Sequence, residues 1–561
     1  MRIGKRLPKL CSGEEEIMSF RDGIALRIRE FFGAVHLPER FAAAYAFLLM
    51  LLHPLVYDNY FFNINRFKFA VFAYGAFAAL IVYLLLCLLR RRAMAGQTYE
   101  PFRLTLSDGG MALFVVGAAV SCAMSKDSYS AFTGDEGRLT GLLFVLALGA
   151  VYIVVSRSVH AQKCAVVGLA ISGAVCAVVG ILHFFYVDPL GFQEKLNKKD
   201  IVAFISTIGN INFFGAFLCL HIPLCAGLMF RDRWYVRAPM CLLIAAGSLA
   251  VVVSRTDAAL FAPAIAIVFS FYTGVKSKRA LAGACLTAAS VFAGFWVSGV
   301  LIGDDSLTHM PLDGNLAAYI ADCPVFMAVL AVLFSAVAFA LFCEHDRQFT
   351  KKYVSLVRKI ILYLLILALT AVICAFMYYT FINTDVKLTG PMRFLRFRDK
   401  WGSNRGGVWV RCLKLWNESD WRVKLLGFGP DLLKKPLGDR FGKEIAAYCN
   451  LSFNNAHNEL IQYLLTQGIV GLTGHLMVFA GFILSMYKRA QSDICARAAL
   501  FGAIVLFINS LVSVNQPITT PLMFAMLSAS VSVFTGSGDK IERDTAEYPL
   551  EGKKLHSRRP H

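Results

Sequence analysis

The sequence is poor in charge and contains no cysteine pair typical of a metal or redox site. Only 17% of its 561 residues are charged, whereas 57% are hydrophobic, and the mean hydropathy is +0.59. This composition excludes a cytosolic enzyme and a secreted disulfide scaffold, and it is typical of a membrane protein. The fifteen cysteines form no CxxC pair and lie mostly inside apolar runs as small hydrophobic residues. A disulfide between Cys412 and Cys449 stays open.

The few charges are strongly unbalanced. The chain has 56 Lys/Arg against 37 Asp/Glu, a formal net charge of +19, so we expect an anionic partner or an anionic leaflet. The basic residues stand in short clusters between apolar runs and form no basic domain, which argues against a nucleic-acid partner. We find no signal-peptide cleavage pattern and no soluble repeat domain.

The apolar runs predict an all-α, polytopic membrane bundle. A helix that crosses the hydrocarbon core needs about 20 apolar residues, and we expect about 12–14 such helices. The candidate runs are 41–57, 69–89, 110–124, 139–156, 164–187, 203–230, 238–254, 258–274, 280–302, 324–343, 360–381, 459–487, 498–514 and 520–535.

The short connections between these runs predict the orientation of the bundle. Alternate connections, beginning with 90–103, hold 20 Lys/Arg in total, whereas the short connections between them hold 8. Because short cytoplasmic loops carry the excess of Lys/Arg, the first set and both termini are expected inside. The predicted division of the chain is a segment 1–40 with an interfacial helix at 17–32, transmembrane helices over 41–381, an outer loop 382–456, C-terminal transmembrane helices over 457–535 and a disordered cytoplasmic tail 536–561.

The outer loop is the one long connection. It holds 14 Lys/Arg against 7 Asp/Glu, and long loops escape the charge rule, so its basicity needs another reason. We expect a small helical unit that meets an anionic ligand outside the membrane, and the alternative is a solvated cap over the bundle.

Several polar residues are expected at the outer side of the membrane, where buried polar groups mark functional sites. They are Arg138, Asn210, Asn212, Arg255, Arg405 and His457. The alternatives are that Arg138 and Arg255 extend to lipid headgroups and that the two asparagines hydrogen-bond neighbouring helices.

Arg405 begins a predicted helix whose face carries Trp409, with Ser403 or Asn404 as possible caps. A helix N-terminus beside an arginine suits phosphate, and a surface salt bridge is the alternative. His457 opens the next run and can accept a proton or hydrogen-bond a hydroxyl, whereas helix capping is the alternative. Gly468, Gly471 and Gly474 follow at a spacing that lets another helix approach.

The string HNELIQYLLTQGIVGL, from His457, resembles the signature of the O-antigen ligase superfamily, the membrane enzymes that include O-antigen ligases, O-antigen polymerases and bacterial O-oligosaccharyltransferases. SNRGGVW and LLGFGPD, at 403–409 and 425–431, are similar to the family's arginine-tryptophan segment and Gly-x-Gly turn. GNIN at 209–212 and SR at 254–255 also resemble family positions. The resemblance extends over roughly residues 130–480.

The resemblance implies a glycosyltransferase that takes a glycan from a lipid-linked donor, usually undecaprenyl pyrophosphate, on the outer face of the cytoplasmic membrane. It implies catalytic roles for Arg255, Arg405 and His457, and we expect metal-independent transfer without a cofactor. The substrate-binding candidates are Arg138, Asn210, Asn212, Trp409 and Asn458. The acceptor, which could be a glycan, a lipid or a protein, stays open. The rivals are a polysaccharide transporter or flippase and a non-catalytic scaffold that binds an anionic polymer.

Overall fold

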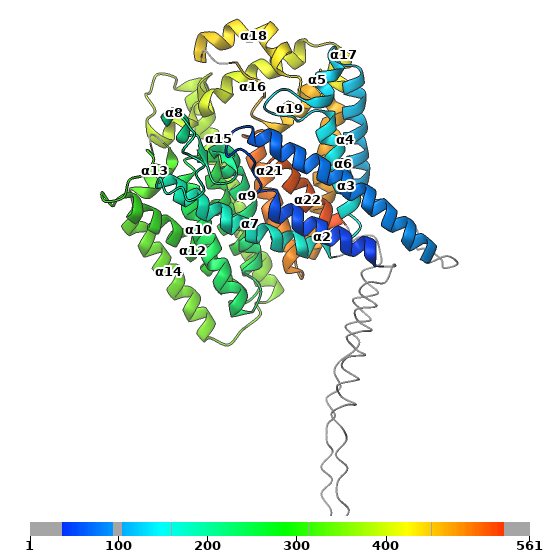
Figure 1. Ribbon diagram of the computed structural model, residues 1–561. Coiled ribbons are helices and arrows are strands. Elements are labelled where there is room, and N and C mark those ends of the chain that lie inside the picture. The colour runs from blue at the N-terminus through cyan, green and yellow to red at the C-terminus, as the bar shows by residue number, and fades with distance from the viewer. Residues whose placement is uncertain (1–35, 94–103, 159, 313–314, 450–451, 532–561) are drawn as a thin grey trace, which may run out of the picture.

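The computed structural model describes residues 36–93, 104–158, 160–312, 315–449 and 452–531. The described chain is mostly helical, and its long helices form a bundle with shorter helices at one end (Figure 1). The expected interfacial helix at 17–32 and the tail at 536–561 lie outside the described residues. The prediction of a polytopic helical membrane protein is confirmed.

The N-terminal part of the chain carries a series of helices with one small hairpin. They are α2 (Leu37–Leu52), α3 (Ile64–Ala93), α4 (Leu106–Ala123), α5 (Ser128–Thr133), α6 (Leu142–Val155), α7 (Ala161–Phe184), α8 (Lys198–Ile201), β1 (Phe204–Ile205), β2 (Gly209–Asn210), α9 (Ile211–Leu228), α10 (Trp234–Val253), η1 (Asp257–Leu260) and α11 (Phe261–Gly274). The two strands are antiparallel, with Phe204 opposite Asn210 and Ile205 opposite Gly209.

The C-terminal part begins with further long helices and includes a group of shorter ones. They are α12 (Lys278–Ile302), α13 (Leu316–Ala321), α14 (Pro324–Cys343), α15 (Lys351–Met377), the π turn η2 (Tyr378–Ile382), η3 (Gly390–Leu395), α16 (Trp401–Glu418), α17 (Trp421–Leu426), α18 (Lys434–Cys449), α19 (Glu459–Thr466), α20 (Gly468–Arg489), α21 (Ile494–Ser510) and α22 (Thr520–Val531). We call the segment from η3 to α18 the cap.

Each expected apolar run contains a helix. Within the described ranges, ten helices are long and apolar enough to cross a membrane, and the apolar helices α6, α21 and α22 are shorter. Two runs differ from expectation. The run 203–230 begins with the β1–β2 hairpin, so its helix starts at Ile211. The run 459–487 is broken into two helices, α19 and α20. The break lies at Gly468, the first residue of α20, whose φ of 66° is in the left-handed region that favours glycine.

Glycines bring α4 and α20 into backbone contact. A Cβ on Gly474 would lie 2.4 Å from the backbone nitrogen of Phe114, and a Cβ on Gly481 would lie 2.6 Å from that of Ser107. From the other side, a Cβ on Gly110 would meet the backbone nitrogen of Val478 at 2.6 Å. Only residues without a side chain allow helix axes to come this close. The sequence spacing predicted such an approach, and Gly474 makes it.

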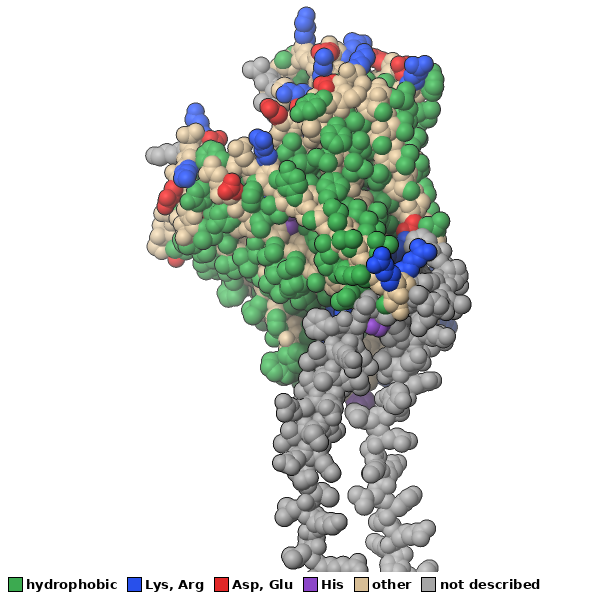
Figure 2. All heavy atoms as spheres, turned by 45° about the vertical axis from the view of Figure 1, so that its right-hand side comes forward, with side chains coloured by type: hydrophobic (Ala, Val, Ile, Leu, Met, Phe, Trp, Pro, Cys, Tyr) green, Lys and Arg blue, Asp and Glu red, His purple; other side chains and the backbone are tan. Residues whose placement is uncertain are grey.

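On the face that Figure 2 shows, the surface of the bundle is apolar across its middle. Hydrophobic side chains cover a broad belt there, most of the charged side chains lie above it, and a few Lys/Arg lie at its lower edge. The helix α15 has no buried residue along its whole length, so its apolar side chains face lipid rather than protein. This distribution is what a bilayer requires of a spanning bundle.

The cap has its own small core. Val408, Cys412 and Leu415 of α16 pack with Leu437 and Phe441 of α18, and each of these side chains is at most 7% exposed. The outer loop is therefore helical, as expected. Cys412 and Cys449 are both free thiols.

The cap is joined to the broken helix through backbone contacts. The N–H groups of Phe428 and Gly429 donate to the carbonyls of Leu465 (2.8 Å) and Thr466 (3.1 Å) at the end of α19. A Cβ on Gly427 would lie 2.3 Å from the Thr466 carbonyl carbon, and a Cβ on Gly468 would lie 2.2 Å from that of Leu425. The segment GFG at 427–429 thus supplies hydrogen bonds that the break in the helix would otherwise leave unmade.

Candidate functional site

A cavity of about 810 Å³ lies between the cap and the end of the bundle. Asn212 and Arg255 line it from the bundle, and Arg405 lines it from the beginning of α16. These residues are far apart in the sequence, and the fold brings them to one space. The volume lies within the range of pockets that hold small molecules and cofactors.

The cavity wall is strongly basic. Seven Lys/Arg line it against two Asp, namely Arg255, Lys387, Arg393, Arg396, Arg398, Lys400 and Arg405 against Asp257 and Asp385. Six of these seven cations come from the outer loop. A cavity with this excess of positive charge favours an anionic ligand. Its guanidinium groups can bind phosphate oxygens in pairs of parallel hydrogen bonds.

Arg255 lies directly after α10, at a residue with left-handed backbone (φ 55°). It is 9% exposed, and its Nη2 donates to the carbonyl of Val202. Its Nε is buried and has no hydrogen-bond partner among the described residues. Burial lowers the pKa of this guanidinium. A desolvated cation with an unused donor is stabilised when an anion binds beside it.

Arg405 follows a sharp turn in which Gly402, Ser403 and Asn404 all have left-handed backbone, with φ between 57° and 74°. The helix is therefore kinked before Arg405, and Ser403 and Asn404 belong to the kink, while Lys400 is the N-cap residue. Burial lowers the pKa of Arg405, and the Asp257 carboxylate opposes this effect. Arg405 lines the cavity and does not extend from the surface of the cap.

The loop that carries His457 is held by hydrogen bonds on both sides. Trp409 Nε1 donates to the carbonyl of Ala456 (2.9 Å), and the Ala456 N–H donates to Gln462 Oε1 (2.9 Å). The His457 N–H donates to Asn455 Oδ1 (2.8 Å). The N-cap of α19 is Asn458, whose Oδ1 accepts from the N–H of Ile461. Asn458 therefore caps α19, and the imidazole of His457 is not needed for capping.

The His457 ring sits next to two arginines. Burial lowers its pKa to about 3, and the charges of Arg138 and Arg405 act in the same direction. The ring also meets Phe453 edge to face, with 6.0 Å between centroids. The imidazole is therefore neutral at physiological pH and keeps a nitrogen that can accept a hydrogen bond or a proton.

Arg138 reaches the same region from the loop before α6. Its Nε donates to Asn454 Oδ1 (3.2 Å), three residues before His457. The turn that carries Arg138 is fixed by Asp431, whose Oδ2 accepts from the backbone N–H groups of Asp135 (2.9 Å) and Thr140 (3.0 Å). Burial raises the pKa of Asp431 to about 6. No local sequence pattern predicts this role, because Asp431 and its two partners lie about 290 residues apart in the chain.

The eight candidate residues thus fall into three groups. Asn212, Arg255 and Arg405 line the cavity, while Arg138 and His457 stand beside it. The side chains of the other three have local tasks, since Asn210 caps α9, Asn458 caps α19 and Trp409 holds Ala456. The alternative for the asparagines was a hydrogen bond to a neighbouring helix. The Asn210 side chain instead accepts a hydrogen bond from the N–H of Asn212 in its own helix.

The cations that sequence reasoning missed are on η3 and the segments around it. Lys387, Arg393, Arg396, Arg398 and Lys400 all line the cavity. The excess of Lys/Arg in the outer loop was their only signal in the sequence, and it does not distinguish these five from the cations on the surface of the cap, such as Arg440.

Left-handed backbone recurs at the residues around the cavity. Arg255 (φ 55°), Asn404 (φ 74°) and His457 (φ 52°) are three of ten non-glycine residues with positive φ in the described chain. Such a conformation costs on the order of 1 kcal/mol or more and persists where neighbouring contacts enforce it, often at functional sites.

The described residues contain no group of three or more His, Cys, Asp or Glu that could hold a metal ion. Metal independence stays a prediction.

The comparison with protein families agrees with the resemblance seen in the sequence. Residues 325–476 match the family model described as O-antigen ligase. The matched stretch includes Arg405, Trp409, His457 and Asn458, whereas Arg138, Asn210, Asn212 and Arg255 lie before it. No curated protein matches the chain. The chain is therefore a multi-pass membrane protein in which residues 325–476 match the O-antigen ligase family model.

Proposed function

We propose that this protein transfers a glycan from a lipid-diphosphate carrier, of the undecaprenyl pyrophosphate type, to a hydroxyl group of an acceptor. The observation that carries the proposal is the 810 Å³ cavity, which two partly desolvated arginines from distant segments line together. The O-antigen ligase domain supports lipid-linked glycans as the substrate class. The charge of the connecting loops supports a site on the outer face of the cytoplasmic membrane.

The reaction needs charge stabilisation more than any other assistance. The acceptor oxygen attacks the anomeric carbon, the new glycosidic bond forms, and the bond from that carbon to the phosphate oxygen breaks. The electron pair of the broken bond stays on the departing lipid diphosphate. Arg255 and Arg405 would neutralise this charge, and fixed cations of this kind contribute about 3 to 4 kcal/mol each, or two to three decades in rate.

His457 would take the proton that the acceptor hydroxyl loses. Its imidazole is neutral before the donor binds, because burial and two arginines disfavour the charged form. A bound diphosphate would offset the positive charge of Arg405 and so make the imidazole a stronger base when the donor is in place. Proton transfer by a positioned side chain typically contributes two to four decades in rate.

Variants at these residues test the proposal. Arg405→Ala and His457→Ala should each abolish formation of the surface glycan when they replace the chromosomal copy, while the amount of protein in the membrane stays unchanged. The matched control is Arg440→Ala, since Arg440 is an exposed cation of the cap that pairs with Glu418 at 2.8 Å. Arg255→Lys should keep part of the activity if point charge suffices, and little if paired hydrogen bonds to phosphate are needed.

Binding of undecaprenyl pyrophosphate itself separates catalysis from docking. We expect weaker binding by Arg405→Ala and unchanged binding by His457→Ala. Full glycan transfer by the His457→Ala variant would refute the role of His457 as proton acceptor. Binding of the lipid diphosphate by the purified wild-type protein without any glycan transfer would favour a scaffold that only binds an anionic polymer. Transport of the lipid-linked glycan without any new glycosidic bond would favour the flippase alternative.

A further inference from the structure

A second cavity, of about 490 Å³, lies at the opposite end of the bundle. It is formed by the end of α11, the connection to α12 and the first turns of α15, and Lys276 and Lys351 are among its lining residues. The helix α15 links the two ends of the molecule, because the chain that follows it enters the cap. Its 27 residues span about 40 Å at 1.5 Å per residue, which is the thickness of a bilayer with its headgroups.

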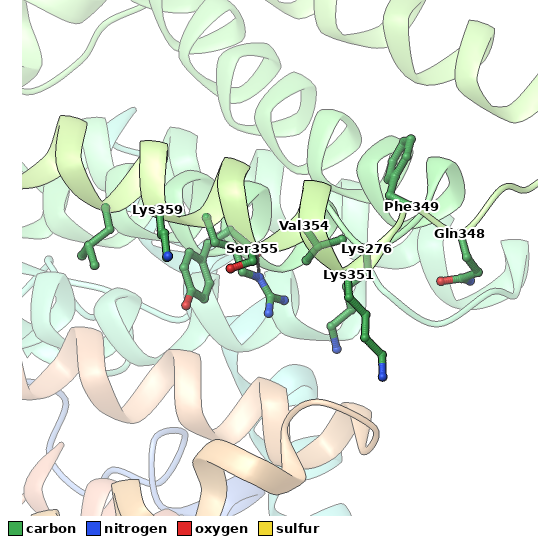
Figure 3. Close-up of a pocket in the computed structure, with 10 residues that line it drawn as sticks. Lys276, Gln348, Phe349, Lys351, Val354, Ser355 and Lys359 are labelled. Carbon is green, nitrogen blue, oxygen red and sulfur yellow. Dashed lines mark hydrogen bonds between the residues drawn. The ribbon is translucent and has the colours of Figure 1, made fainter.

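This second cavity is basic and has no acidic residue in its lining. The cations are Lys276, Lys351, Arg358 and Lys359, and Figure 3 shows the amino groups of Lys276, Lys351 and Lys359 on the same side of α15. Among the described residues, the two hydrogen bonds that these cations make go to uncharged backbone: Lys276 Nζ donates to the Gln491 carbonyl (2.9 Å), and Arg358 Nε donates to the Tyr272 carbonyl (3.0 Å).

The neighbouring cations behave differently. Lys278 pairs with Glu344, and Arg279 Nη1 pairs with Asp232 Oδ2 at 2.6 Å. The four cavity cations form no ion pair with a carboxylate in the part of the chain that the structure describes. The carboxylates present at this end of the bundle thus neutralise cations beside the cavity and leave those inside it without a counter-charge.

Three effects favour an anion in this space. Lys276 is partly buried, and burial, followed by the charges of Arg497 and Arg358, lowers its pKa. Lys351 lies in the first turn of α15, where the helix dipole is positive and disfavours a cation. The guanidinium of Arg358 lies 4.9 Å from the ring centroid of Tyr272, which keeps it at the cavity wall. An anion would relieve the repulsion among these groups.

The surroundings of the cavity identify what kind of anion fits. The wall of the cavity includes Leu362 of α15. No residue of α15 is buried, so the apolar side chains of this helix are accessible beside the cavity. A ligand that enters here therefore meets charge at one end and lipid-facing apolar surface at the other. We propose that this cavity binds the phosphate headgroup of an anionic phospholipid from the leaflet at this end of the bundle, with its acyl chains along α15.

The test titrates the full-length protein, in a neutral detergent, with phosphatidylglycerol and measures bound lipid by native mass spectrometry. Phosphatidylglycerol should bind, whereas phosphatidylcholine and inorganic phosphate should not bind at the same concentrations. One lysine near an anionic lipid surface is worth about fivefold in affinity, so Lys351→Gln should weaken binding about fivefold, and the double variant with Lys359→Gln roughly 20- to 30-fold.

The control is Lys352→Gln, which removes the same charge from the adjacent residue, which is also exposed and does not line the cavity. Lys351→Arg preserves the charge and should keep the affinity, which guards against misfolding as the cause of a loss. Equal losses in Lys351→Gln and Lys352→Gln would mean general surface attraction and overturn the proposal. Equal binding of inorganic phosphate, or binding of phosphatidylglycerol that none of these variants weakens, would overturn it as well.

Discussion

The hydrogen bond from Trp409 to the carbonyl of Ala456 allows a sharp test of how His457 is positioned. The bond joins α16 of the cap to the residue directly before His457, at 2.9 Å. Trp409→Phe keeps an aromatic ring beside Trp401, whose centroid lies 5.5 Å away, and removes the N–H donor together with part of the indole ring. We expect the loop at 454–458 to sample other positions, so that His457 meets the acceptor hydroxyl less often.

The expected size of the effect follows from the one bond that is lost. A hydrogen bond of this kind contributes about 1 kcal/mol net, which corresponds to roughly a fivefold loss in transfer rate if the whole loss is felt at His457. The other bonds to the loop, from Ala456 to Gln462 and from His457 to Asn455, stay in place. The effect should therefore be far smaller than that of His457→Ala.

The same helix offers a matched control. Trp416 Nε1 is buried and has no hydrogen-bond partner within the described residues, so Trp416→Phe removes an indole N–H without breaking such a bond. The assay is the initial rate of glycan transfer in membrane vesicles with equal amounts of each variant, together with thermal unfolding in detergent. Equal rates for Trp409→Phe and the wild type, or an equal fall in rate for both tryptophan variants, would refute the positioning role.

Two other predictions concern pH and helix packing. Because burial lowers the pKa of His457 to about 3, its imidazole stays neutral from pH 8 to pH 5, and acidification over this range should not reduce kcat/KM through His457. Any change centred near pH 6 should disappear in Asp431→Asn, since Asp431 has a pKa of about 6; a limb at pH 6.5 that survives in that variant would contradict the assignment. Gly474→Ala would place a Cβ 2.4 Å from the backbone of Phe114 and should destabilise the protein by about 1 to 3 kcal/mol. Gly442→Ala, which meets open space in α18, should leave the melting temperature unchanged or raise it, and equal melting temperatures for the two variants would count against close packing of α4 on α20.

The helices could be predicted from the sequence because a bilayer leaves few alternatives. An apolar run of about 20 residues must satisfy its backbone internally, so a helix is expected wherever such a run occurs. The exceptions are local. Gly209 has a φ of 93° and Gly468 a φ of 66°, and at each the chain takes a conformation that hydropathy does not encode. The hairpin before α9 and the break before α20 were therefore missed.

For the candidate site, the sequence indicated the arginines and the histidine, and it did not indicate the contacts that support them. Arg405 and His457 stand in short motifs that resemble a known family, and the fold brings Arg255 to the same cavity as Arg405. The role of Asp431 depends on partners about 290 residues away, and that of Trp409 on a carbonyl 47 residues away. Such pairings arise from the path of the chain in space, which no local pattern contains.

The junction between GFG and the end of α19 bears on how the proposed lipid-linked donor would reach the cavity. Lifting the cap away from the membrane would separate Phe428 and Gly429 from the carbonyls of Leu465 and Thr466. Each carbonyl left without a partner in a region shielded from water costs about 1 to 3 kcal/mol. Opening the cap like a hinged lid would therefore cost free energy. Sideways diffusion within the bilayer, past α15 with its exposed side chains, would avoid this cost and would suit the lipid-linked donor that we propose.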